Sequence, residues 1–248
     1  MVIFIGVKLF FYYKGSKVYY EYIKQPKVPI LFLHGWGGST ESFKGFYEEG
    51  DILLDFPPFG KSQKPIVEYT LNDYVNIVVL LLRKINVDKV NIVAHSFGAR
   101  VAICLAAKYN IVDRLIITAG AGIRPRFSLK KYFAKIRYKR AKKLVQKNKL
   151  NVSYLNKFGS DDYKKLDNLM KKTFVNIVNY YQNDILKDIR CDTLLVWGKD
   201  DNQTPLYMAK HIKRHIKNCQ LITYEGGHFV YLEKSFAFLK IINAFLRN

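Results

Sequence analysis

Cysteine and negative charge are both scarce in this chain. Its 248 residues include 20 Asp and Glu against 41 Lys and Arg, and only three cysteines, Cys104, Cys191 and Cys219. No two cysteines form a CxxC pair, and an odd number without such spacing argues against a disulfide-stapled secreted protein. The sequence also lacks a metal-ligand cluster and a phosphate-cradling loop, so we expect neither a metal nor another cofactor.

Long apolar runs are missing as well. No stretch approaches the ~18 consecutive apolar residues that a membrane-spanning helix needs. The apolar N-terminus, residues 1–13, lacks a basic leading region and an Ala-x-Ala cleavage site, and Lys8 interrupts it, unlike a signal peptide. Its aromatic and β-branched residues favour a strand. Together with the scarcity of cysteine, these absences predict a cytoplasmic protein.

The excess of positive charge is concentrated in one segment. The formal net charge is +21, and residues 124–150 contain twelve Lys or Arg but no Asp or Glu. Apolar residues recur there at roughly helical spacing, which predicts a basic amphipathic helix or helix pair. Three interpretations of this segment stay open. It could form a lid over the active site with its charged face in solvent, or a surface for anionic substrates or acidic lipids. A nucleic-acid-binding surface is the third, although no recognised motif supports it.

Short strand patterns alternate with helical patterns over most of the chain. Such alternation predicts a mostly parallel sheet covered by helices on both faces, of about eight strands including an N-terminal hairpin. Residues 123–186 interrupt this alternation, because their pattern is helical and they contain no strand candidate. No Gly-, Ser- or Pro-rich linker separates them from the rest of the chain. We therefore predict an α/β core at 1–122 and 187–248 and a helical lid at 123–186. Strands are expected at 7–13, 17–23, 28–33, 51–55, 90–93, 114–118, 193–197 and 220–224, and helices at 70–85, up to about 110, at 205–216 and at 229–246.

Three residues with the chemistry of acyl transfer follow predicted strands. Ser96 stands between the small residues Ala94 and Gly98, a pattern typical of the tight turn that exposes a nucleophile between strand and helix. An acid, Asp200 or Asp201, and then His228 follow later strands. Ser, acid and His in this order supply a nucleophile, a base and a group that orients the base.

Four motifs in this order resemble the α/β-hydrolase family in its lid-bearing, single-domain form, and the resemblance covers nearly the whole chain. One motif departs from the family pattern, because Pro58 stands where a glycine is usual. The motifs are His34-Gly35-Trp36-Gly37, the run from Asp55 to Ser62, Gly198 with Asp201 and Pro205, and Gly227-His228 with Glu233.

The resemblance implies a role for each site residue. Ser96 is the expected nucleophile, His228 the base and Asp201, by its spacing, a better acid than Asp200. The backbone N–H groups of Trp36 and Phe97 are the expected oxyanion donors. We expect His34 to brace its loop and His95 to be a packing residue.

The predicted function is that of a serine hydrolase, carboxylesterase-like, acting on a small or medium acyl ester through an acyl-enzyme on Ser96. The family resemblance equally allows a carbon–carbon bond hydrolase, a monoacylglycerol lipase or a perhydrolase with the same triad. A protein of this fold that binds ligands without turnover is a further alternative. The expected partner is a small-molecule acyl substrate.

Overall fold

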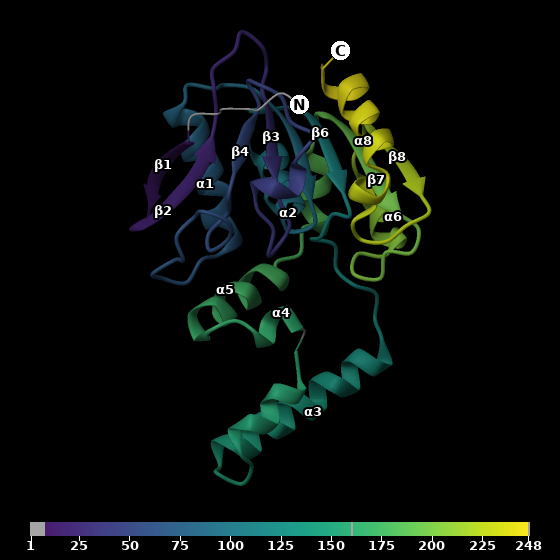
Figure 1. Cartoon of the computed structure of the whole chain (residues 1–248). Coiled ribbons are helices and arrows are strands. Elements are labelled where there is room, and N and C mark those ends of the chain that lie inside the picture. Colours follow the sequence, from purple (N-terminus) through teal and green to yellow (C-terminus); the bar gives the residue numbers. More distant parts are fainter. Residues whose placement is uncertain (1–7, 160, 248) are drawn as a thin grey trace.

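A twisted sheet of eight strands forms the centre of the protein in the computed structural model (Figure 1), which describes residues 8–159 and 161–247. The strands are β1 (Lys8–Tyr13), β2 (Ser16–Glu21), β3 (Ile30–Leu33), β4 (Ile52–Leu54), β5 (Val90–His95), β6 (Val112–Thr118), β7 (Asp192–Gly198) and β8 (Cys219–Tyr224). Their order in the sheet is β1-β2-β4-β3-β5-β6-β7-β8. The pairs β1–β2 and β2–β4 are antiparallel and the others parallel. The expected mostly parallel sheet is confirmed, although Val7, predicted to start the first strand, lies outside the described residues.

Helices cover both faces of the sheet, because the parallel strands are apolar on both sides. Leu31 and Leu33 of β3 face the core cluster that includes α1 (Leu71–Lys84), α2 (Phe97–Lys108) and α6 (Leu206–His215). Ile30 and Phe32 of the same strand face the other cluster, with α7 (Val230–Glu233) and α8 (Ser235–Ile242). The alternation brings the carboxyl ends of β5, β7 and β8 to one edge of a sheet buried on both sides.

The chain between β6 and β7 is helical, as its pattern predicts. It contains α3 (Leu129–Gln146), α4 (Asp161–Lys164) and α5 (Asn168–Val178), with 3₁₀ turns at Val152–Lys157 and Asn183–Asp188. The described residues of 123–186 include no strand. We call this segment the helical insertion. In Figure 1, α5 lies next to the core, whereas α3 extends away from the sheet.

The C-terminal helix predicted at 229–246 is wrong as a single element. The structure divides it into α7, α8 and a π-helical turn at Asn243–Arg247. The first break falls at Lys234, whose φ of −118° and ψ of 40° lie outside the α region. Apolar periodicity predicts which residues face the sheet, but it contains no signal for one residue that leaves helical geometry.

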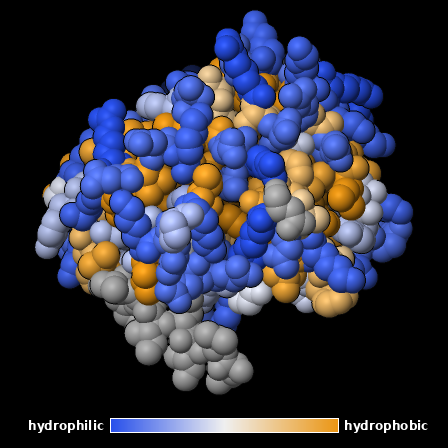
Figure 2. All heavy atoms as spheres, turned by 90° about the horizontal axis from the view of Figure 1, so that it is seen from above, coloured by the Kyte–Doolittle hydropathy of each residue, from blue (hydrophilic) through white to orange (hydrophobic). Residues whose placement is uncertain are grey.

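The surface opposite the helical insertion is dominated by hydrophilic side chains, with apolar side chains between them (Figure 2). This mixture is usual for protein surface exposed to water. Within 8–159 and 161–247, no helix is long and apolar enough to cross a bilayer. All three cysteines are free, with Cys104 buried and Cys191 and Cys219 partly buried.

Candidate active site

The turn from β5 into α2 holds Ser96 in an uncommon backbone conformation. Its φ is 49° and its ψ is −106°, in a region that residues other than glycine rarely adopt. Gly98 must be small, because a Cβ there would overlap the carbonyl oxygen of Leu33. Ala94, in the position where glycine is usual, is fully buried in β5. The side chain of Ser96 thus lies at the carboxyl edge of the sheet, where the sequence places the nucleophile.

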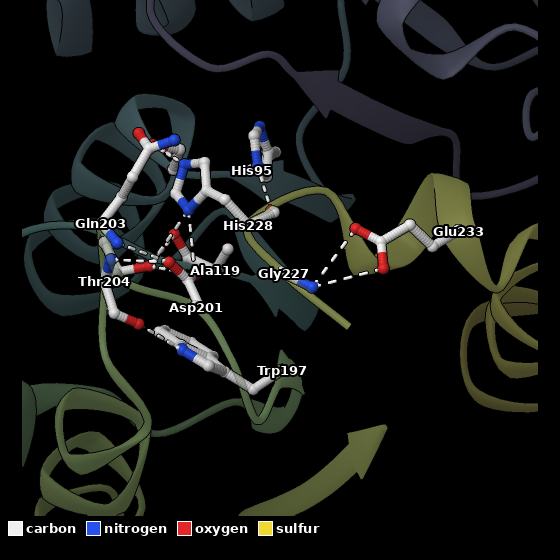
Figure 3. A network of polar contacts seen from close by, with 10 residues as sticks. His95, Ala119, Trp197, Asp201, Gln203, Thr204, Gly227, His228 and Glu233 are labelled. Carbon is white, nitrogen blue, oxygen red and sulfur yellow. Dashed lines mark hydrogen bonds and ion pairs between the residues drawn. The ribbon is translucent and has the colours of Figure 1, made fainter. Parts of the chain in front are cut away.

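The structure brings Ser96, His228 and Asp201 together in one hydrogen-bonded chain. Ser96 Oγ lies 3.1 Å from His228 Nε2, and His228 Nδ1 lies 2.9 Å from Asp201 Oδ2. Figure 3 shows the ring of His228 directed at Asp201 and Thr204. With the imidazole neutral and its proton on Nδ1, that N–H donates to Asp201, and Nε2 accepts from the Ser96 hydroxyl.

Asp201 is held by a set of donors that favour its ionised form. Its Oδ1 accepts from the backbone N–H groups of Gln203 and Thr204 at 2.8 and 2.9 Å, and its Oδ2 accepts from Thr204 Oγ1 at 2.7 Å. Burial raises the pKa of Asp201, but the hydrogen bonds from His228 and Thr204 outweigh it and bring that pKa below its ordinary value. Asp200, the alternative acid, is exposed.

Hydrogen bonds to Glu233 and from His95 fix the loop that carries His228. The backbone N–H of Gly227 donates to both carboxylate oxygens of Glu233, each at 3.2 Å, as Figure 3 shows. His95 Nε2 donates to the carbonyl oxygen of His228 at 3.1 Å. Burial, with a smaller contribution from His228, lowers the pKa of His95 to about 3, so His95 is neutral, and this hydrogen bond adds a support of the loop to the packing role expected of it.

The loop after β3 lies against Ser96 and contributes Trp36. A Cβ built on Gly35 would stand 3.4 Å from Ser96 Cβ, and the rings of Trp36 and Phe97 are in edge contact with centroids 5.5 Å apart. The N–H groups of Trp36 and Phe97 donate to no residue within the described ranges. Two backbone donors without partners therefore stand beside the candidate nucleophile.

His34 joins this loop to the end of β4. Its Nδ1–H donates to Gly35 O at 2.7 Å, and its Nε2 accepts from Phe56 N–H at 2.8 Å. Burial lowers the pKa of His34, which favours the neutral ring that this pair of bonds requires. The expectation that His34 braces the loop agrees with these contacts.

A cavity of about 290 Å³ opens beside Ser96. Larger hollows lie elsewhere on the molecule, but Ser96 and His228 both line the 290 Å³ cavity. Residues of α5 line the cavity, whereas the apolar residues Leu129, Tyr132 and Phe133 of α3 are exposed. Its lining consists of Trp36, Ser96, Phe97, Arg100, Ala121, Phe174, Ile177, Val178, Gln203, Thr204 and His228.

Two residues at this site were not predicted from the sequence. Thr204, which donates to Asp201, directly precedes Pro205 of the motif. Threonine is common at the start of a helix, so its presence there gave no signal of a role in the site. Arg100 lines the cavity, and its signal was present, since it is a charged residue in the small and apolar run after Ser96. In the part of the chain that the structure describes, no three His, Cys, Asp or Glu side chains gather as metal ligands would.

Comparison with known proteins gives concordant matches in sequence. A family model for the alpha/beta hydrolase fold matches residues 28–144, and a model described as TAP-like protein matches residues 178–248. The uncharacterized hydrolase YugF of Bacillus subtilis is 26% identical over 243 residues, covering 87% of this chain and 89% of that protein. A 2-hydroxy-6-oxo-2,4-heptadienoate hydrolase of Pseudomonas putida is 22% identical, covering 88% of each chain.

Solved structures agree with these matches. A hydrolase from Pseudomonas aeruginosa superimposes with a TM-score of 0.75 at 17% sequence identity, covering 98% of this chain and 99% of that one. At 17% identity this structural similarity shows that the two proteins share a fold, and no more than that. It extends over the sheet, the helices on both faces and the region of the helical insertion.

Proposed function

Because the chain belongs to the α/β-hydrolase fold family, we propose that it is a serine hydrolase that cleaves a small or medium acyl ester on Ser96. The observation that supports this proposal is the chain of hydrogen bonds from Ser96 through His228 to Asp201, at 3.1 and 2.9 Å, beside a cavity. Nucleophile, base and orienting acid each have the partner that this chemistry requires.

The first half of the reaction forms an acyl-enzyme. Ser96 Oγ attacks the ester carbonyl carbon while its proton passes to His228 Nε2, and Asp201 stabilises the imidazolium. The oxyanion of the tetrahedral intermediate accepts from the N–H groups of Trp36 and Phe97, whose positions at the loop and at the N-terminus of α2 suit this role. The intermediate collapses when the C–O bond to the alcohol breaks, and His228 donates its proton to the leaving oxygen.

The second half of the reaction repeats these steps with water. Water takes the place of the alcohol, gives its proton to His228 Nε2 and attacks the acyl carbon on Ser96. The second tetrahedral intermediate releases the carboxylic acid when Ser96 Oγ leaves and regains the proton from His228. The two halves use the same residues, and each begins with a neutral His228 imidazole whose Nε2 can accept a proton.

The lining of the cavity supports a small or medium acyl group. Phe174, Ile177 and Val178 of α5 line it together with Trp36 and Phe97, and the rings of Trp36 and Phe174 are in edge contact with centroids 5.1 Å apart. Its 290 Å³ is at the lower end of the range for small-molecule sites. We propose that the helical insertion acts as a lid through α5, with the predicted boundaries of 123–186.

An ester panel of graded acyl length tests the proposal. Acetyl, butyryl, hexanoyl and decanoyl esters should be hydrolysed with a maximum of kcat/KM at short or intermediate length. Ser96→Ala should abolish turnover without loss of folding, as seen by circular dichroism. Folded wild-type protein that hydrolyses none of these esters, or a Ser96→Ala variant that retains the activity, contradicts the proposal.

A second candidate is hydrolysis of a carbon–carbon bond in a dienoate. It is favoured by the relative from Pseudomonas putida, which carries that activity in its name and matches 88% of this chain. The same Ser96, His228 and Asp201 would serve. Loss of the absorbance of a 2-hydroxy-6-oxo-dienoate, measured beside the ester panel, separates the two candidates.

A further inference from the structure

A buried arginine lines the cavity one helical turn from Ser96. Arg100 belongs to α2 and is only 8% exposed, yet it is among the residues that border the cavity with Ser96 and His228. Four residues along an α-helix correspond to about 6 Å of axial rise. A positive charge therefore stands within the reach of a short acyl chain attached to Ser96.

The guanidinium of Arg100 has only part of its hydrogen-bonding capacity satisfied. Its Nη1 donates to the carbonyl oxygens of Ile177 and Tyr180, at 3.0 and 2.7 Å. Within residues 8–159 and 161–247, its Nε and Nη2 donate to no residue. Neither atom is fully buried, because both are absent from the set of fully buried polar atoms without a partner. A guanidinium with two nitrogens left over retains donors for a ligand that enters the cavity.

No carboxylate balances this charge among the described residues. None of their ion pairs includes Arg100. Burial lowers the pKa of Arg100 to about 10, so that the side chain remains charged at neutral pH. A buried charge without a counter-ion is costly to the folded protein, and carbonyl oxygens offset that cost only in part.

We propose that Arg100 is the anion-binding residue of the acyl pocket, and that the substrates are half-esters of short dicarboxylic acids. This inference rests on the proposed function at Ser96. A carboxylate at the far end of a five- or six-carbon acyl chain would accept from the unused Arg100 nitrogens, and the charge-assisted contact would supply the missing counter-ion. The ester carbonyl would then lie at Ser96 Oγ while the aliphatic part of the acyl chain contacts Phe174 and Ile177.

A purely structural role of Arg100 makes a different prediction. The residues that accept from Nη1, Ile177 and Tyr180, lie at and just beyond the C-terminus of α5, and a cation commonly stabilises carbonyls at such a terminus. If holding α5 were its whole role, replacing Arg100 would impair all substrates equally. Discrimination between a charged and an uncharged ester would then stay unchanged.

The test compares monoethyl adipate with ethyl hexanoate, which has the same chain length without the carboxylate. We expect wild-type kcat/KM to be about 10-fold or more higher for monoethyl adipate, since hydrogen bonds between charged groups are stronger than neutral ones. Arg100→Gln should remove this preference, because kcat/KM falls more for monoethyl adipate than for ethyl hexanoate, and Arg100→Lys should retain part of it. Lys108→Gln, which removes a positive charge at the other end of α2, is the matched control and should retain the full preference.

Binding of adipate to Ser96→Ala, measured by calorimetry, is independent of turnover. We expect it to bind adipate more tightly than hexanoate, and Arg100→Gln to abolish the difference. A wild type without preference for monoethyl adipate, equal loss on both esters in Arg100→Gln, or equal binding of the two acids overturns the inference. If no ester is cleaved but Ser96→Ala binds adipate through Arg100, the proposed function fails and the anion site stands.

Discussion

Neighbouring aspartates at the end of β7 show how individual contacts select the acid. Asp201 is buried and accepts from three donors besides His228, namely two backbone N–H groups and the Thr204 hydroxyl. Asp200 is exposed and its backbone N–H donates to Gly226 O. The carboxylate that holds His228 is therefore fixed before substrate arrives.

Replacing Asp201 by Asn tests this difference. We expect Asp201→Asn to lower kcat by about 10⁴-fold, because an amide no longer holds the proton of His228 on Nδ1 or stabilises the imidazolium. Asp200→Asn, one residue away, should change kcat less than about twofold, because surface substitutions away from such contacts have small effects. Steady-state hydrolysis of one ester by both variants provides the measurement, and equal effects would contradict the assignment of Asp201.

At the residue scale, the sequence predicted side chains that belong to motifs and missed those that depend on packing. Ser96, His228 and an acid at Asp200 or Asp201 were predicted because each follows a strand of a parallel sheet, and the family resemblance favoured Asp201 by its spacing. The support given by Thr204 and the place of Arg100 in the cavity depend on how α5 and the loop after β7 meet α2. A charged residue in the apolar run after Ser96 marked Arg100 as unusual, but no local pattern contains its tertiary contacts.

At the scale of elements, the sequence predicted where α1 begins, but not the contact between the start of α1 and the N-terminal hairpin. The pattern Thr70-Leu71-Asn72-Asp73 forms a capping box at this start, with Thr70 N–H and Oγ1 donating to Asp73 Oδ2 at 2.7 and 2.8 Å. Asp73 Oδ1 also accepts from Tyr13 Oη at 2.8 Å and lies 2.6 Å from Lys14 Nζ. The helix start is thus tied to the hairpin of β1 and β2.

The contacts of Asp73 predict a pH-dependent contribution to stability. Burial raises the pKa of Asp73, but the bonds from Lys14, Thr70 and Tyr13 outweigh it and bring the pKa below its ordinary value. A carboxyl whose pKa is lower in the folded state stabilises the protein above its unfolded pKa, and this contribution is lost as the pH falls through the folded pKa. Asp73→Asn should lower the free energy of unfolding by about 1–2 kcal/mol at neutral pH, and the difference from wild type should shrink below about pH 4.

Urea denaturation of both proteins at neutral and acidic pH measures this effect. Asp88→Asn, at an exposed position beyond the end of α1, is the matched control and should leave the free energy of unfolding nearly unchanged. A difference between wild type and Asp73→Asn that persists at the lower pH would show that the ionised carboxylate is not its source.

The positions of elements were harder to predict than their existence. The core strands and helices lie within a few residues of their expected places, because burial on both faces of the sheet leaves a clear apolar pattern. The role of the basic segment was not predictable, since an apolar stripe on a helix does not identify its partner. Residues of α5 line the cavity at Ser96, whereas Tyr132 and Phe133 of the basic α3 are exposed.

At the scale of the whole molecule, the positive charge is distributed asymmetrically. The net charge is +21, and α3 carries only basic side chains among its charged residues. Phe174 and Val178 of α5 line both the cavity at Ser96 and a hollow that α3 borders. We propose that the field of α3 attracts anionic substrates toward the cavity.

This proposal predicts an effect of salt that depends on the charge of the substrate. Raising the salt from about 0.05 to about 0.5 M should lower kcat/KM several-fold for monoethyl adipate but not for ethyl hexanoate, because screening shortens the range of the field. Combined replacement of Lys135, Lys139 and Lys142 of α3 by Gln should reduce this dependence. The same change at Lys27, Lys84 and Lys89, three exposed lysines outside the helical insertion, is the matched control, and equal salt responses of the two esters would contradict the proposal.

Covalent labelling by a fluorophosphonate tests the central claim most directly, because it requires a nucleophilic serine activated by its base but no knowledge of the substrate. The account predicts that the folded wild-type protein is labelled at Ser96, as located by peptide mass spectrometry. Ser96→Ala should not be labelled, and His228→Ala should be labelled much more slowly. Folded wild-type protein that remains unlabelled, or a label found on another residue and retained in Ser96→Ala, would contradict the account.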